Sequence, residues 1–100
     1  MTPTLTPSQA TADALAVLKA AGFSEPGFAA TRAVRVTSQD AAYPGIQRAD
    51  NTPKAIATTV QKAGPLTDLR EAGRLLATLP GVLQVSADPD IVIVIRNKER

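Results

Sequence analysis

The segment VLQVSADPDIVIVI, residues 82–95, decides the fold class of this chain. Two runs rich in β-branched residues flank Asp88-Pro89-Asp90, whose residue types favour a tight turn, so the segment predicts an antiparallel hairpin. Pairing Ala87 with Ile91 across this turn places six apolar side chains on one face, which we expect to meet the helices. These are Leu83, Val85, Ala87, Ile91, Ile93 and Ile95. The opposite face then carries Gln84, Ser86, Val92 and Val94.

Three helices are predicted upstream of this hairpin. The segment TPSQ, residues 6–9, has the residues of an N-cap and capping box, so a helix should run from there to about Ala21. A second, short helix is predicted before Gly64-Pro65, and a third between Thr67-Asp68 and Pro80-Gly81. The apolar residues that indicate the second helix by their spacing are Ile56, Ala57, Val60 and Ala63.

A first pair of strands is expected between the first two helices. Residues 32–37 alternate apolar and polar side chains, as a half-buried strand does, and residues 46–48 predict a shorter strand that returns beside them. The predicted order is therefore α-β-β-α-α-β-β. This order indicates an α+β fold, in which a small, mainly antiparallel sheet of about four strands packs on two or three helices.

The chain has the length of one domain, residues 1–100, and we expect its ends, 1–5 and 97–100, to be flexible. The third helix, the corner at Leu79-Pro80-Gly81-Val82 and the hairpin that follows resemble half of a ferredoxin-like sandwich. Such a likeness of fold transfers no function.

Composition excludes several kinds of chemistry. The chain contains no Cys and no His, so it offers no thiol nucleophile, no imidazole base and no zinc site of the usual nitrogen and sulfur ligands. Asp88 and Asp90 could pair as carboxylates, but beside a turn proline they are more typical of a turn. We therefore expect a protein that is not an enzyme and that uses no cofactor, metal or small-molecule substrate. No apolar run approaches the length of a membrane span, so a cytoplasmic protein is expected.

The predicted docking surface is the mixed face of the sheet, to which the hairpin contributes Gln84, Ser86, Val92 and Val94 and the first pair of strands contributes Arg35. Its members Arg35, Gln84, Val92 and Val94 are the expected contacts with a protein partner or with a second copy in a homodimer. The loop after residue 40 adds an aromatic and a charged residue, Tyr43 and Arg48, which are types that recur in interface hot spots. The predicted function is that of a small binding protein that docks a macromolecule through this face or through a strand edge.

Binding to nucleic acid is the alternative. Eleven Lys and Arg against nine Asp and Glu give a net charge of only +2, and the predicted strands carry no aromatic residues to stack on bases. The second and third predicted helices could still form a helix-turn-helix, with the third as recognition helix. The basic residues that would contact phosphates are Arg32, Arg35, Arg48, Lys54, Arg70, Arg74, Arg96 and Lys98.

Overall fold

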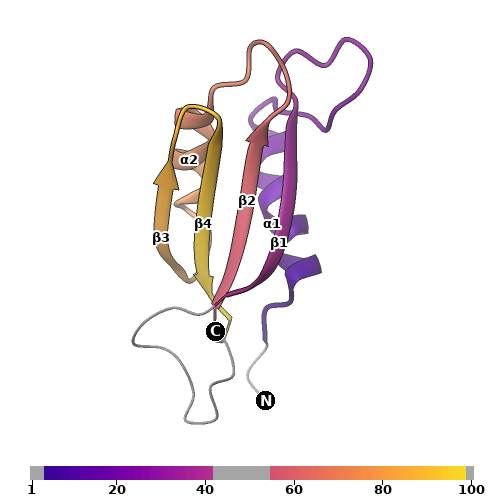
Figure 1. Ribbon diagram of the computed structural model, residues 1–100. Coiled ribbons are helices and arrows are strands. Elements are labelled where there is room, and N and C mark those ends of the chain that lie inside the picture. The colour runs from indigo at the N-terminus through magenta and orange to yellow at the C-terminus, as the bar shows by residue number, and fades with distance from the viewer. Residues whose placement is uncertain (1–3, 42–54, 99–100) are drawn as a thin grey trace.

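A computed structural model describes residues 4–41 and 55–98 (Figure 1). It confirms the predicted α+β class, with helices and an antiparallel sheet in the order α-β-β-α-β-β. The elements are α1 (Pro7–Ala20), β1 (Val34–Ala41), β2 (Ala55–Lys62), α2 (Leu69–Leu76), β3 (Val82–Ala87) and β4 (Ile91–Asn97). The short strand predicted at residues 46–48 lies outside the described residues.

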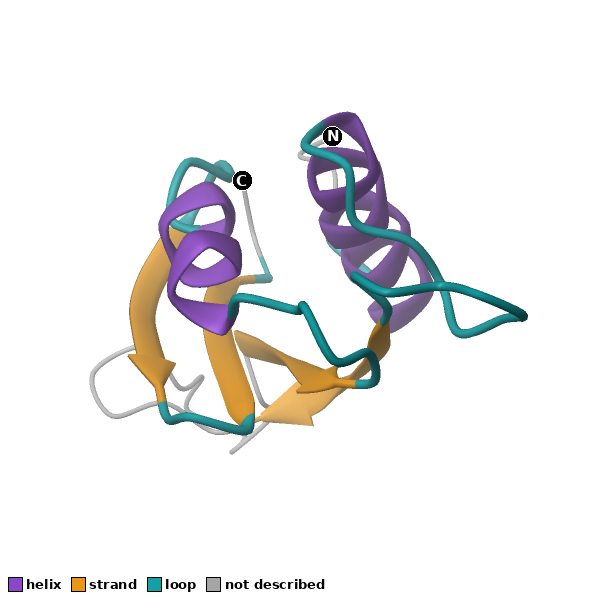
Figure 2. Cartoon of the chain, turned by 90° about the horizontal axis from the view of Figure 1, so that it is seen from above, coloured by secondary structure: helices purple, strands orange, loops and turns teal. Residues whose placement is uncertain are grey.

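The four strands form one sheet in the order β1-β2-β4-β3, with every neighbouring pair antiparallel. Both helices lie on the same side of this sheet (Figure 2). We call the side that meets the helices the inner face and the other side the outer face. Figure 1 shows the sheet from its outer face, with the helices behind it.

The connectivity is that of a ferredoxin-like sandwich whose first strand stands at the end of the chain. Placing β4 before α1 would give the order β-α-β-β-α-β, with the crossover from β2 through α2 to β3 spanning one intervening strand. The N–H of Leu5 donates to the carbonyl of Lys98 at 2.7 Å, so the start of α1 lies beside the end of β4. Leu5 is buried with Ala10 and Ile56, although it belongs to the segment 1–5 that the sequence predicts to be flexible.

The predicted second helix is wrong, because residues 55–62 form the strand β2. Its apolar residues fit two periods at once, since Ile56 and Val60 can share a helix face but also lie on the same side of a strand. Four of its eight residues, Ile56, Thr58, Thr59 and Val60, are β-branched, which favours the strand. In the structure, Ile56, Thr58 and Val60 are buried on the inner face.

The hairpin formed by β3 and β4 exists as predicted, but its register is displaced by one residue. Ala87 pairs with Val92 and Val85 with Val94, and the N–H of Asp88 donates to the carbonyl of Ile91 at 2.8 Å. Because successive side chains point to opposite faces, this displacement exchanges the faces of β4. The valines of β4 meet the helices, and its isoleucines lie on the outer face.

The helix starts confirm the predicted N-caps, although the Gln9 side chain donates to Asp13 at 2.9 Å and does not close the predicted capping box. The Thr6 hydroxyl accepts from the N–H of Gln9 at 3.1 Å, and the Asp68 carboxylate accepts from the N–H of Arg70 at 2.9 Å. Gly22, with φ of +96°, follows α1 in the left-handed region expected of a helix stop. Helix α2, which corresponds to the third predicted helix, ends at Leu76, before the stop predicted at Pro80-Gly81.

The core fills the space between the inner face and the two helices. Leu18 of α1 and Leu76 of α2 are fully buried against valines from three strands. Val36, Leu79, Val82 and Val85 pack partly buried around them. The buried valines are Val34, Val60, Val92 and Val94.

Two glycines should respond in opposite directions to the same substitution. A Cβ at Gly64 would lie against the backbone of the loop before β1. It would be 2.7 Å from the nitrogen of Ala33 and closer still to the carbonyl oxygen of Thr31. We expect Gly64→Ala to destabilise the protein by about 3 kcal/mol, because backbone cannot swing aside. A Cβ at Gly73, inside α2, would meet side chains only at 3.8 Å or more, so Gly73→Ala should stabilise by about 0.5–1 kcal/mol.

Urea denaturation of the two glycine variants provides the measurement. Equal destabilisation by both substitutions would contradict the close approach of Gly64 to residues 31–33.

Candidate interaction surface

The outer face is a mixed surface with an apolar centre. Ile91, Ile93 and Ile95 run along β4, one of the two central strands, and all three are partly exposed. Polar side chains flank them on the neighbouring strands. Two described charged residues, Arg35 on β1 and Asp88 in the turn opposite Ile91, lie at opposite margins of this face. The members of the outer face are Arg35, Thr37, Gln39, Ala57, Thr59, Gln61, Gln84, Ser86, Ile91, Ile93 and Ile95.

The strand register arranges these side chains in rows across the sheet. Ile93 lies at the centre, opposite Thr59 on one side and Ser86 on the other, and Thr37 completes the row on β1. Ile95 lies between Ala57 and Gln84, and the Gln84 amide donates to the Ser86 hydroxyl at 3.0 Å. Ile93 and Ile95 therefore have small or uncharged polar neighbours, as the centre of a protein interface does, whereas Ile91 lies between Gln61 and the turn residue Asp88.

The structure places the predicted docking residues in three different environments. Arg35 and Gln84 are exposed on the outer face, as expected. The expectation for Val92 and Val94 is wrong, because both are 0% exposed in the core, and the displaced register is the reason. Tyr43 and Arg48 lie outside the described residues. The isoleucines that take the place of the valines were assigned to the core, so sequence reasoning found the strand but missed its accessible side.

Comparison with protein-family models, curated proteins and solved structures gives no match to this chain. Its function must therefore be argued from its own residues.

Several residues of the nucleic-acid alternative have structural partners. Arg32 donates to Glu71 at 3.0 Å and to the carbonyl of Ala21 at 3.1 Å, and its guanidinium lies 4.3 Å from the centre of the Phe23 ring. These contacts connect the end of α1 with α2. Lys98 pairs with the Asp40 carboxylate at 2.8 Å, which offsets its charge.

Arg96 is the largest departure from the expected basic tail. It points inward from β4, is 1% exposed, and pairs with Asp13 of α1 at 3.0 Å. Its Nε donates to the carbonyl of Pro80 at 3.0 Å. Arg96 shares a face with Val92 and Val94, which the predicted register placed outward, so the displaced register is also the reason for its burial.

The remaining described arginines do not form one stripe. Arg70 and Arg74 are exposed on α2, which covers the inner face, whereas Arg35 lies on the outer face. A helix-turn-helix is wrong for residues 55–76, because β2 stands where its first helix was expected. Arg48 and Lys54 lie outside the described residues.

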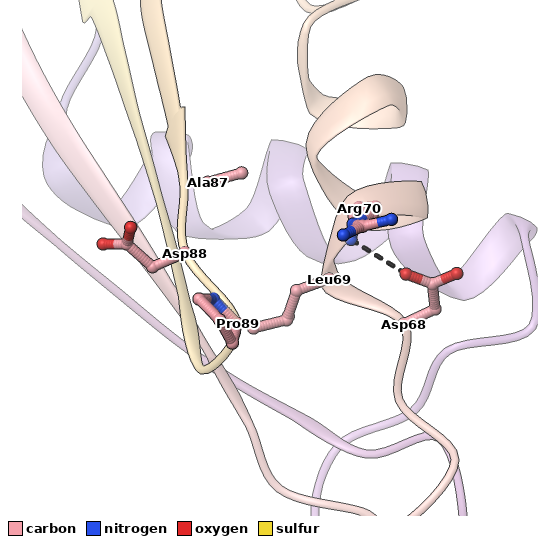
Figure 3. A pocket seen from close by; sticks show the side chains of 6 residues that line it. All are labelled: Asp68, Leu69, Arg70, Ala87, Asp88 and Pro89. Atoms are coloured by element: carbon pink, nitrogen blue, oxygen red, sulfur yellow. Dashed lines mark hydrogen bonds between the residues drawn. The ribbon is translucent and has the colours of Figure 1, made fainter.

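A hollow of about 370 Å³ lies between the start of α2 and the turn from β3 to β4 (Figure 3). Asp68 is engaged in capping α2, and Figure 3 shows Leu69 and Pro89 between it and Asp88. Asp88 and Asp90 belong to the turn, as predicted: the N–H of Asp88 donates to Ile91, and the carbonyl of Asp90 accepts from the N–H of Lys62. Figure 3 thus places the Asp68 and Asp88 carboxylates on opposite sides of Leu69 and Pro89.

Over residues 4–41 and 55–98, no group of three or more acidic side chains lies close enough together to hold a metal ion. None of the helices in that part of the chain is long and apolar enough to cross a membrane.

Proposed function

We propose that this protein is a non-enzymatic protein-interaction module that associates with a second copy of itself through its outer face. The observation that carries this proposal is the partly exposed stripe of Ile91, Ile93 and Ile95 on a face whose described charged residues, Arg35 and Asp88, lie at its margins. Depletion of charge around an apolar centre is the compositional signature of interface cores.

A second copy is the occupant that this chemistry favours. A two-fold interface brings the same patch of both subunits together, so the patch must complement itself. Isoleucine, threonine, serine and glutamine can meet their own kind without charge repulsion, and Arg35 lies at the margin on β1. Two sheets stacked about 10 Å apart would let both isoleucine stripes interdigitate.

The size of the face predicts a weak dimer. Four strands about 4.8 Å apart and about seven residues long, at roughly 3.3 Å per residue, cover roughly 450 Å². Two such faces would bury close to the ~1,000 Å² that a specific interface should reach. We therefore expect a dissociation constant on the order of micromolar.

Sedimentation and light scattering test this proposal. The wild-type mass should rise from 10.4 kDa toward twice that value as concentration increases through the micromolar range. Ile93→Lys should keep the protein monomeric, because it places two like charges at the centre of the interface. Leu66→Lys is the matched control, since Leu66 is exposed in the connection between β2 and α2 and belongs to none of the strands that form the outer face.

A wild-type chain that stays monomeric at about 1 mM would overturn the proposal. A dimer that survives Ile93→Lys but not Leu66→Lys would also overturn it, because association would then use another surface.

A further inference from the structure

The edge of β1 that faces away from β2 carries backbone hydrogen-bonding groups that have no partner among the described residues. Ser24 pairs with this edge as a single parallel bridge: its N–H donates to Arg32 at 3.1 Å, and its carbonyl accepts from the N–H of Val34 at 2.9 Å. The N–H of Val34 therefore points away from β2, and so do the backbone groups of alternate residues further along, Val36 and Ser38. No described residue pairs with Val36 or Ser38 on that side.

Beside this edge lies an open groove of about 310 Å³ between α1 and β1. Leu15 of α1 and Val36 of β1 give it an apolar floor, both being partly buried. Pro26 lines the groove just beyond Ser24, and as a proline it has no N–H to continue the bridge. Ser24 therefore pairs with this edge as a single bridge, and no described residue pairs with the next positions of β1.

The other edge of the sheet is less suited to pairing. Strand β3 has six residues, and a bulge between Val82 and Gln84 interrupts its register. Bulges twist an edge and block regular pairing. Strand β1 is paired in unbroken register over all eight residues, so its free edge is a straight template.

We propose that the groove between α1 and β1 binds an extended peptide segment of a partner protein, which adds to the sheet beside Val36 and Ser38. Alternate side chains of an added strand point to opposite faces. A side chain opposite Val36 enters the groove against Leu15 and should be apolar. Its neighbour opposite Arg35 lies on the outer face and should be acidic, since Arg35 is exposed and forms no ion pair with any described residue.

This proposal predicts a recognisable peptide. Main-chain hydrogen bonds to Val36 and Ser38 supply sequence-independent affinity, and the two side-chain positions supply the preference. Selection from a library of random linear twelve-residue peptides should enrich an aliphatic residue directly adjacent to Asp or Glu. A consensus with helical spacing, or no enrichment, would overturn the proposal.

N-methylated versions of the selected peptide test the binding mode directly. Methylation at the residues whose N–H groups face β1 should weaken binding by at least about tenfold, because each methyl group removes a hydrogen bond and also clashes with β1. Methylation at the alternating residues should have little effect, since their N–H groups face solvent. Equal sensitivity in both registers would show that the peptide does not bind as a strand.

Two arginine variants test the acidic preference. Arg35→Glu should weaken binding of the selected peptide by about tenfold. Changing the acidic residue of the peptide to Lys should restore binding to this variant. Arg70→Glu, at an exposed arginine of α2, makes the same charge change away from the groove and should leave binding unchanged. Equal effects of the two variants would contradict the role of Arg35.

Hydrogen exchange separates this site from the dimer face. Bound peptide should slow amide exchange at Val36 and Ser38 and leave Thr37, already paired with β2, almost unchanged. Ile93→Lys should still bind the peptide, because Ile93 lies two strands away on β4. Failure of dimerisation and failure of peptide binding are therefore distinguishable.

Discussion

Val94→Asp should unfold this protein, whereas Ile93→Asp, one residue earlier on the same strand, should leave it folded. Val94 is 0% exposed on the inner face, between Thr58 and Val85 on the neighbouring strands. An unpaired carboxylate there would destabilise the protein by roughly 5 kcal/mol or more, which approaches the whole stability of many domains of this size. Ile93 lies partly exposed between Thr59 and Ser86, so its carboxylate stays in water, and we expect a loss of only about 1 kcal/mol.

Circular dichroism and urea denaturation of the two aspartate variants measure this contrast. Val94→Asp should lose the cooperative transition, and Ile93→Asp should keep it with a slightly lower midpoint. The reverse result would restore the register in which Ala87 pairs with Ile91 and the isoleucines form the core.

The sequence could predict the hairpin but not its register. Both faces of IVIVI carry β-branched residues, so hydrophobicity alone does not say whether valines or isoleucines are buried. The deciding feature is the connection. Asp88 pairs with Ile91, so the loop consists of the two residues Pro89 and Asp90, a length that hairpins favour over three. The bulge at Leu83 then realigns the far end, which no local pattern reveals.

The strand β2 shows a second limit of local patterns. Its residues could form a short helix in isolation, but β2 lies between β1 and β4, and both of its edges are paired. A central position depends on pairing with distant segments, as Ala55 pairs with Asn97 of β4, and periodicity within one segment cannot report such pairing. Helix α1, by contrast, was predictable because Thr6, Pro7 and Gln9 specify its start through contacts within four residues.

The residues of the candidate surface also divide into those that local patterns predict and those that depend on distant contacts. Arg35 and Gln84 were found because they are polar residues on clear strands, whichever way the hairpin is aligned with the helices. The isoleucine stripe depends on the register and was missed. The edge groove depends on Ser24 returning to Val34 after α1, a contact that nothing in the sequence around Ser24 announces.

The buried ion pair of Asp13 and Arg96 leads to the second large effect. The Arg96 guanidinium is held by Asp13 at 3.0 Å and by Pro80 at 3.0 Å, while its Nη2 has no hydrogen-bond partner in the described part of the chain. Asp13→Ala would leave this buried cation without that carboxylate, and we expect a loss of about 3–5 kcal/mol in unfolding free energy. Glu25→Ala is the control, because the Glu25–Lys19 pair is exposed and should contribute less than about 1 kcal/mol.

The double variant Asp13→Leu, Arg96→Met distinguishes a stabilising pair from a costly one. An already unsatisfied Nη2 means that the site does not fully offset the desolvation of Arg96, so an apolar pair of similar volume should recover most of the stability lost in Asp13→Ala. Urea denaturation should place the double variant within about 1 kcal/mol of wild type. If the double variant is as unstable as Asp13→Ala, the charges themselves hold α1 to the end of β4. If the double variant recovers the stability, then packing of buried side chains holds α1 in place. The ion pair would then serve only to neutralise the cation of Arg96 on the inner face.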